Sequence, residues 1–197
     1  MKKIAYLTRH GETVNNLKNV FQGRSDSPLT ELGVKQAEQL RDYFKENDIT
    51  FDHAYSSVLG RAIATADILT EGKIKVEHLE GLNERYYGDL EGKSHDVKRY
   101  PGFDEEHGCE TYPKTSKRVS ECMINIMEEE CNQKVLIVTH GGALRSFVNL
   151  WENDYDLEMA HVPNLALYVM EYEDKKFSCK KIVYQDFSKL EEELNGK

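Results

Sequence analysis

The sequence has few cysteines, few prolines and no long apolar run. Its four cysteines lie at irregular spacings without a CxxC pair, which argues against a disulfide framework and predicts reduced thiols. No stretch approaches the roughly 18 consecutive apolar residues of a membrane span. The first apolar run, Ile4–Leu7, is too short for a signal peptide. These absences predict a cytoplasmic protein that is not bound to a membrane.

Basic residues are outnumbered by acidic ones. The chain carries 26 Lys and Arg against 35 Asp and Glu, for a formal net charge of −9. Non-specific binding to nucleic acid and binding to an anionic membrane both need a basic surface, so neither partner is expected. An anionic substrate must therefore be held by a local cluster of cations. At 197 residues, a single domain spanning 1–197 with a sizeable core is expected.

Short β-prone runs alternate with amphipathic helical patterns along the chain. The patterns predict helices over 31–47, 59–69, 112–130 and 142–151, and strands over Ile4–Thr8, Phe51–Ser56, Ile74–Glu77 and Lys134–Thr139, followed by a hairpin of Ala166–Tyr172 and Phe177–Tyr184. Thr30 is the expected N-cap of the first helix. This alternation predicts an α/β three-layer sandwich, in which helices cover both faces of a mostly parallel central sheet.

Two parts of the chain lack a clear pattern. The stretch at about 85–113 is irregular, and we interpret it as a lid-like insertion that would set substrate specificity. Its aromatic residues either form apolar walls for a bulky alcohol or pack the lid on the core: Tyr86, Tyr87, Tyr100, Phe103 and Tyr112. The acidic tail after Ser188 is either helical or frayed.

Polar clusters follow three of the predicted strands. Arg9-His10-Gly11 follows the first, Ser56-Ser57 ends the second, and His140-Gly141-Gly142 follows Lys134–Thr139. Ligands of parallel sheets bind beyond the carboxyl ends of the strands, so these clusters are expected to meet at one edge.

The residue types in these clusters suit a phosphate group. An arginine offers a rigid fork that matches phosphate oxygens, and a neighbouring cation would keep His10 neutral and nucleophilic. The helix that follows Gly141-Gly142 would present free N–H groups and its positive dipole end to an anion. Arg61, early in another helix, could reach the same edge.

Several longer stretches carry a resemblance to a known family. They are LTRHGET at 7–13, Asn16, PLTELGVKQA at 28–37, YSSVLGRAIATA at 55–66, LNERYYGDLEG at 82–92 and VTHGG at 138–142. In order and content they resemble the histidine phosphatase superfamily, in its phosphoglycerate mutase-like branch. The matching stretches lie between about residues 4 and 170, most of the chain.

The resemblance implies a role for each matching residue. His10 matches the nucleophile that becomes a phosphohistidine, and Glu84 matches the carboxyl that protonates the leaving oxygen. His140 is implied to be catalytic as well, and we expect it to be protonated beside the phosphoryl group. Substrate-binding roles are implied for Arg9, Asn16, Arg61, Gln22, Gly23 and Gly141. No cofactor is implied, and because arginines beside His10, Glu12 and His140 would repel a cation, no metal site is predicted.

The family contains both phosphatases and mutases. Mutases that resemble this chain carry a longer insertion with extra basic residues, whereas here only 56 positions separate Glu84 from His140. Residues 85–118 hold seven basic and seven acidic residues, a poor clamp for a bisphosphate. The sequence therefore favours a phosphatase of the histidine acid phosphatase type, acting on a small phosphomonoester.

Two alternatives stay open. A cofactor-dependent phosphoglycerate mutase is one, because Arg85 matches a mutase residue, and a non-catalytic phosphate-binding module is the other. Gly108-Cys109-Glu110-Thr111 stands where short members commonly carry Gly-Glu-Ser, which leaves its role open. A homodimer is compatible with the sequence. Five further histidines lack motif support and are expected to be surface or hydrogen-bonded residues: His53, His78, His95, His107 and His161.

Overall fold

The computed structural model describes residues 2–151 and 162–196. Its strands are β1 (Lys3–Arg9), β2 (His53–Ser56), β3 (Val76–His78), β4 (Lys134–Thr139), β5 (Leu167–Glu173) and β6 (Lys176–Val183). Its helices are α1 (Val14–Leu17), α2 (Glu31–Glu46), α3 (Gly60–Thr70), α4 (Phe103–Glu106), α5 (Tyr112–Glu128), α6 (Gly141–Trp151) and α7 (Ser188–Asn195). None of these helices is long and apolar enough to cross a membrane.

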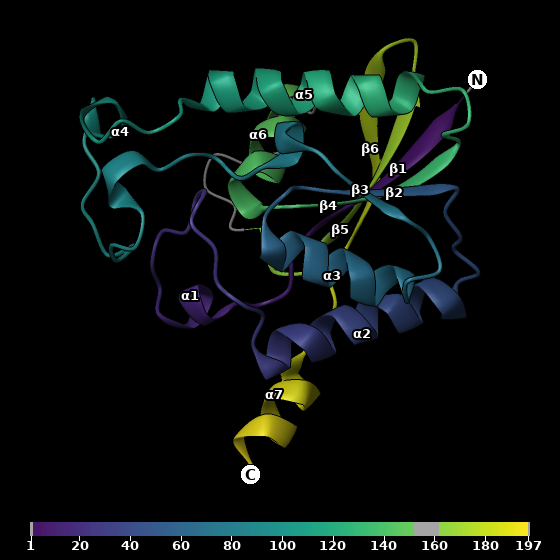
Figure 1. Ribbon diagram of the computed structural model, residues 1–197, viewed down its shortest axis with the longest axis horizontal. Helices are drawn as coiled ribbons and strands as arrows, with labels where there is room; N and C mark the ends of the chain where they lie inside the picture. The colour runs from purple at the N-terminus through teal and green to yellow at the C-terminus, as the bar shows by residue number, and fades with distance from the viewer. Residues whose placement is uncertain (1, 152–161, 197) are drawn as a thin grey trace.

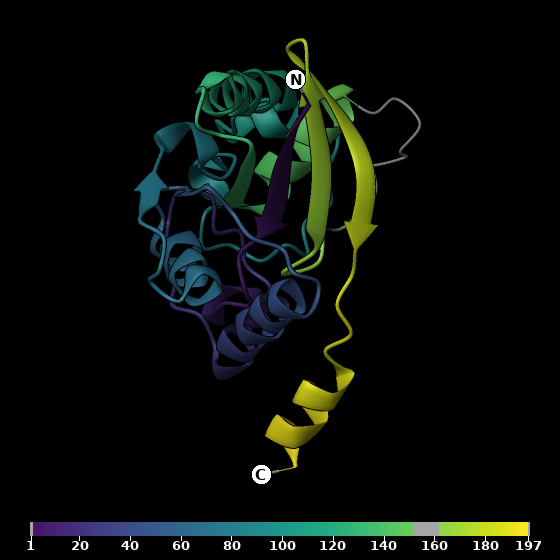
Figure 2. The ribbon, with the colours of Figure 1, turned by 90° about the vertical axis from the view of Figure 1, so that its right-hand side faces the viewer.

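The strands form one mixed sheet in the order β3-β2-β4-β1-β5-β6. The neighbours β3 and β2, β2 and β4, and β4 and β1 are parallel, while β5 pairs antiparallel with both β1 and β6. The outer strand β6 leads into α7 at the C-terminal end (Figure 2). The predicted mostly parallel sheet and the C-terminal hairpin are both confirmed.

Strand β4 shows why the sheet is covered on both faces. Its side chains alternate, so Val135 and Ile137 pack in the core formed with α5 and α6, while Leu136 and Val138 pack against α2 and α3. All four are fully buried. Figure 1 shows α5 and α6 on one side of the sheet and α2 and α3 on the other. The predicted three-layer α/β sandwich is confirmed.

Most element boundaries agree with the sequence patterns to within two residues. β4 covers the predicted residues, and Thr30 caps α2 as predicted, its hydroxyl accepting a hydrogen bond of 2.9 Å from the Gly33 N–H. The short helices α1 and α4 were not predicted, because four residues hold too little periodicity to be recognised.

The irregular stretch between Asn83 and Thr111 packs on a small core of its own. Phe103 and Cys109 from this stretch are buried together with Leu90 and with Phe21 from the loop after α1. In Figure 1 this stretch and α4 lie at one end of the molecule, away from β6. For Phe103, the interpretation as packing is therefore the correct one.

The register of the parallel strands brings their carboxyl ends together. Arg9, the last residue of β1, pairs with Thr139 at the end of β4, and Ser56 of β2 pairs with Val138. The residues that follow these strands, His10, Ser57 and His140, therefore start at one edge of the sheet.

We expect Leu136→Ala to lower the free energy of unfolding by about 2–5 kcal/mol, because it removes buried methyl groups from a closely packed layer. Leu150→Ala on α6 is the matched control, since the Leu150 side chain is half exposed and should cost well under half as much. Chemical denaturation followed by circular dichroism measures both. Similar losses in the two variants would contradict the assignment of β4 to the centre of the core.

Candidate active site

The two motif histidines meet at the predicted edge of the sheet. The ring centroids of His10 and His140 lie 5.2 Å apart, and both residues are buried. Ser57, which follows β2, places its hydroxyl oxygen 2.6 Å from His140 Nε2. The three polar clusters that the sequence placed after separate strands thus form one site.

Hydrogen bonds fix which nitrogen of His10 carries the proton. Nδ1 lies 2.7 Å from the carbonyl oxygen of Gly11, which can only accept, so Nδ1 donates and Nε2 keeps its lone pair. The Arg61 Nε–H donates to that lone pair at 3.2 Å. Burial, followed by the charges of Arg61 and Arg9, holds the pKa of His10 well below its ordinary value of 6.5. His10 is therefore neutral at physiological pH, as a nucleophile must be.

The Arg61 guanidinium is buried and held by the loop that precedes α2. Its Nη1 donates to the Ser25 carbonyl oxygen at 2.8 Å and to Asp26 Oδ1 at 3.0 Å, and its Nη2 donates to the Gly23 carbonyl oxygen at 2.8 Å. Gly23 has a φ of +55°, a conformation that favours glycine, and a Cβ there would lie 2.0 Å from Glu91 Oε1, so any other residue would displace the Glu91 side chain. The Gln22-Gly23 loop thus positions the Arg61 side chain. Both loop residues also line the cavity beside His10.

Arg9, at the end of β1, directly precedes His10, and Asn16 belongs to α1. Arg9 is buried and its Nη1 donates to the Val162 carbonyl oxygen at 2.7 Å. Asn16 closes the capping box of α1, where its Oδ1 accepts from the Thr13 N–H at 3.1 Å. The Asn164 amide donates to the His10 carbonyl oxygen at 2.8 Å. These contacts fix the backbone and side chains around the nucleophile.

His140 is held in a neutral state in the absence of a phosphoryl group. Burial, followed by the nearby charge of Arg61, holds the pKa of His140 well below 6.5, so the ring is neutral rather than protonated. A bound phosphoryl dianion would act in the opposite direction. His140 Nδ1 is buried without a hydrogen-bond partner among the described residues.

Glu84 occupies the anion-binding end of α6. Its Oε2 accepts from the Gly142 N–H at 3.0 Å, and its Oε1 accepts from the N–H groups of Ala143 at 2.8 Å and Arg85 at 2.7 Å. The Glu84 carboxylate therefore takes the N–H groups of Gly142 and Ala143 that the sequence expectation left to a substrate anion, while Gly141 at the same helix end lines the cavity. A Cβ at Gly142 would lie 2.7 Å from Glu84 Oε1, which explains the glycine.

The cavity around these residues has a volume of about 590 Å³. Of the residues implied by the resemblance, all except His140 line it: Arg9, His10, Asn16, Gln22, Gly23, Arg61, Glu84 and Gly141. It is also lined by Tyr87, which lies in the matching stretch at 82–92, and by residues that no motif indicated: Asn19, Val20, His95, Arg99, Arg145, Val162 and Asn164. Only the position of Arg145, four residues after Gly141, gave a signal that could have been used.

The histidines without motif support divide into three groups. His78 and His107 are hydrogen-bonded as expected, to Ser56 Oγ at 2.8 Å and Asp89 Oδ1 at 2.7 Å, and His53 is half-buried at the start of β2. His95 is also hydrogen-bonded as expected, to the Val20 backbone, and in addition it lines the cavity and packs on Phe21. His161 lies outside the described residues. Among the described residues, no group of three or more His, Cys, Asp or Glu side chains could hold a metal ion.

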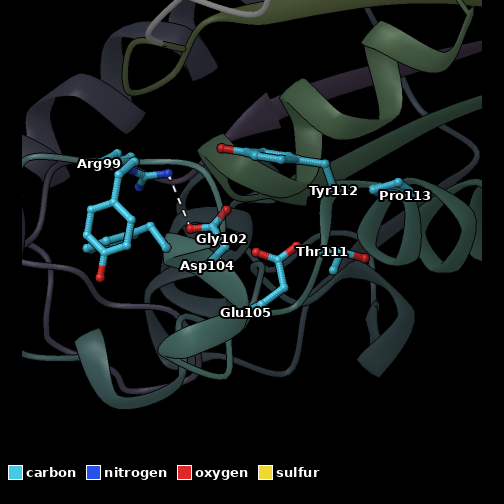
Figure 3. A pocket seen from close by; sticks show the side chains of 9 residues that line it. Arg99, Gly102, Asp104, Glu105, Thr111, Tyr112 and Pro113 are labelled. Carbon is cyan, nitrogen blue, oxygen red and sulfur yellow. Dashed lines mark ion pairs between the residues drawn. The ribbon is translucent and has the colours of Figure 1, made fainter.

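A second cavity, of about 230 Å³, lies within the irregular stretch (Figure 3). Arg99 and Tyr112 lie on opposite sides of it, and Arg99 also lines the larger cavity. Asp104 faces Arg99 at 3.6 Å. Of the five aromatic residues of the insertion, Tyr87 lines the larger cavity, while Tyr86 and Tyr100 are about half exposed. The wall of the larger cavity, next to His10, is therefore mainly polar.

Comparisons with known proteins agree with this site. A curated relative, the uncharacterized phosphatase PhoE of Bacillus subtilis, is 33% identical over 178 residues, which cover 88% of this chain and 91% of the relative. A 2,3-bisphosphoglycerate-dependent phosphoglycerate mutase of Parvibaculum lavamentivorans is 36% identical over 169 residues, covering 75% and 79%. The solved structure of Bacillus stearothermophilus YhfR superposes with a TM-score of 0.80 at 30% identity, covering 90% and 95%.

The sequence model of one family spans nearly the whole chain. It is described as histidine phosphatase superfamily (branch 1), and it matches residues 5–185, which include every residue that lines the cavity. The chain therefore belongs to the histidine phosphatase superfamily.

Proposed function

We propose that this protein is a phosphomonoester hydrolase that forms a phosphohistidine at His10, uses no metal ion and acts on a small phosphorylated metabolite. The observation that carries the proposal is the hydrogen bond from His10 Nδ1 to the Gly11 carbonyl oxygen. It leaves the Nε2 lone pair available in a cavity that Arg9, Arg61 and Glu84 also line. The two guanidinium groups beside His10 would repel a metal cation, which supports a metal-free reaction.

The first step transfers the phosphoryl group to the protein. His10 Nε2 attacks phosphorus in line, the bond to the ester oxygen breaks, and the Glu84 carboxyl gives its proton to the leaving alcohol. Arg9 and Arg61 hold the non-bridging oxygens, on which charge accumulates in the transition state. The dianion would also favour a protonated His140, which then stabilises the same charge. Arg61 already donates to Nε2 and would transfer that hydrogen bond to a phosphate oxygen.

The second step returns the enzyme to its starting form. Water attacks the phosphohistidine, the Glu84 carboxylate takes the proton from that water, and the bond between phosphorus and Nε2 breaks. Inorganic phosphate leaves and Nε2 regains its lone pair. General acid–base help is worth about 10²–10⁴-fold, so most of the rate enhancement must come from the cationic pocket.

A phosphoglycerate mutase is the second candidate, and the Parvibaculum lavamentivorans relative favours it. The placement of Arg85 argues against it. This side chain is fully buried, its Nη2 pairs with Asp104 at 2.6 Å, and its Nε donates to the Glu110 carbonyl oxygen at 2.5 Å. Arg85 holds the insertion together and does not line the cavity, which disfavours a role in clamping a second phosphate. A non-catalytic module is disfavoured because His10, Arg9, Arg61 and Glu84 line one cavity.

We expect wild-type protein in EDTA to release phosphate from phosphomonoesters, and His10→Ala to lower this rate to background because the nucleophile is gone. Phosphate release would be measured over an aryl phosphate, sugar phosphates, nucleotides and phosphoglycerates, with isomerisation of 3-phosphoglycerate followed in parallel. His53→Ala is the matched control, because His53 does not line the cavity. Isomerisation faster than release would favour the mutase, and full activity in His10→Ala would refute the phosphohistidine.

Glu84→Gln tests the general acid. The variant should lose about 10²–10⁴-fold in kcat/KM with an alkyl phosphate, whose leaving group needs a proton, and far less with an activated aryl phosphate. Steady-state kinetics on both substrates give the comparison. Losses of equal size for the two substrate types would contradict the assignment.

Stability at acid pH tests the neutral state of His10. The unfolded ring binds a proton from about pH 6.5 downward, while the folded ring, whose pKa is lowered, does so only at lower pH. The free energy of unfolding should therefore fall as pH drops through 6.5, by at most about 1.4 kcal/mol per pH unit from this ring. Denaturation curves on both sides of that pH should show a smaller fall for His10→Asn. An equal fall in wild type and variant would show that the folded-state pKa is not lowered.

A further inference from the structure

The cavity contains two arginines that the phosphate chemistry does not use. Arg9 and Arg61 are placed beside His10, whereas Arg99 and Arg145 line other parts of the same cavity. Arg99 is paired with Asp104 at 3.6 Å and its guanidinium lies over the rings of Phe21 and Phe103. The charge of Arg99 is thus partly compensated within the insertion, which leaves Arg145 to be explained.

Arg145 is placed by helix α6 and by Tyr112. It lies four residues after Gly141, so both residues share one face of the helix, and both line the cavity. Its Nη2 donates to the Tyr112 hydroxyl at 2.5 Å, and its guanidinium carbon lies 5.1 Å from the centre of the Tyr112 ring. The Arg85 guanidinium carbon lies 4.2 Å from the same centre. Tyr112 therefore ties Arg145 to the insertion.

The charge of Arg145 has no acidic partner among the described residues. Other half-buried or buried arginines of the same region do have one: Arg61 has Asp26 at 3.0 Å, Arg85 has Asp104 at 2.6 Å, and Arg118 has Glu110 at 2.9 Å. An arginine held in place in a cavity without a counterion is suited to an anion that comes from outside.

The position of Arg145 indicates which part of a substrate it would meet. Glu84, the proposed proton donor to the leaving alcohol, binds the N–H groups of Gly142 and Ala143 in the first turn of α6. Arg145 follows within the next turn and lines the same cavity, so an alcohol that leaves toward Glu84 would enter the part of the cavity that Arg145 shares.

We propose that Arg145 binds a second anionic group carried by the alcohol part of the substrate, a carboxylate or a further phosphate. This inference rests on the proposed phosphatase activity and narrows its substrates to phosphomonoesters with two anionic groups. Arg145 is then a specificity-determining residue, and Tyr112 is a positioning residue that acts through it.

Matched substrates that differ in one charge test the proposal. The carboxylate pair is 3-phosphoglycerate against glycerol 3-phosphate, and the phosphate pair is propanediol bisphosphate against propanediol monophosphate. Wild type should prefer the doubly anionic member of at least one pair in kcat/KM by roughly 10- to 100-fold, the size expected for one charge-assisted hydrogen-bonded pair. The pair that shows the preference identifies the anion.

Substitutions assign that preference to Arg145. Arg145→Gln should reduce the ratio within the pair to near one, Arg145→Lys should keep part of it, and Tyr112→Phe should lower it less than Arg145→Gln does. Lys117→Gln is the matched control for charge, since Lys117 lies on the exposed face of α5 and should leave the ratio unchanged. An unchanged ratio in Arg145→Gln, or no preference in wild type for either pair, would overturn the proposal.

A binding measurement separates this inference from the proposed activity. In a His10→Ala background, calorimetry should show roughly 10- to 100-fold weaker binding of the preferred doubly anionic ligand when Arg145→Gln is added, and little change for its singly anionic partner. If this difference holds while wild type hydrolyses no phosphomonoester, including the aryl phosphate, the hydrolase assignment fails and the binding role of Arg145 stands. If hydrolysis proceeds and the difference is missing, only the role of Arg145 fails.

Discussion

Burial of the Arg61 guanidinium is the constraint on which the site depends. A buried cation is costly unless its N–H groups are satisfied, and here Asp26 and the carbonyl oxygens of Gly23 and Ser25 accept from both terminal nitrogens. Those acceptors all come from the loop before α2, so the loop has to close over the start of α3. The remaining Nε–H donates to His10 Nε2, and after burial the Arg61 charge is the largest cause of the lowered pKa of the ring. One side chain thus couples the shape of a loop to the protonation of His10.

Glu84 depends on two separate elements in a comparable way. Helix α6 supplies N–H groups to the Glu84 carboxylate. Arg118 of α5 fixes the backbone just before Glu84 by donating to the carbonyl oxygens of Gly81 at 2.9 Å and Asn83 at 3.0 Å. Arg118 is itself fixed by two hydrogen bonds to the Glu110 carboxylate. Glu110 of Gly108-Cys109-Glu110-Thr111 therefore has a structural role, and the insertion is tied to the backbone that carries Glu84.

The sequence predicts the residues of this site better than their contacts. Strand ends followed by Arg9-His10-Gly11 and His140-Gly141-Gly142 were enough to place both histidines at one edge of the sheet, because parallel strands impose that geometry. The contact of Glu84 with α6 could not be predicted, since no local pattern links residues 58 positions apart. The places of His95 and Arg145 in the cavity wall were not predicted for a related reason, because they depend on how the insertion and α6 pack. The neutral state of His140 without a ligand was not predicted, because it depends on burial rather than on neighbouring sequence.

A cationic cavity in a chain of net charge −9 implies a particular kind of selectivity. At physiological ionic strength the screening length is about 8 Å, so a ligand inside the cavity interacts with the lining arginines much more than with carboxylates on the outer surface. The electrostatic field of the whole molecule does not attract anions. An anionic substrate is therefore bound by the contacts that it makes once it is inside the cavity. Discrimination among phosphoesters then has to come from groups beyond the phosphate pocket. The insertion and the exposed face of α6 are the two segments that supply such groups, and Tyr112 joins them through Arg85 and Arg145.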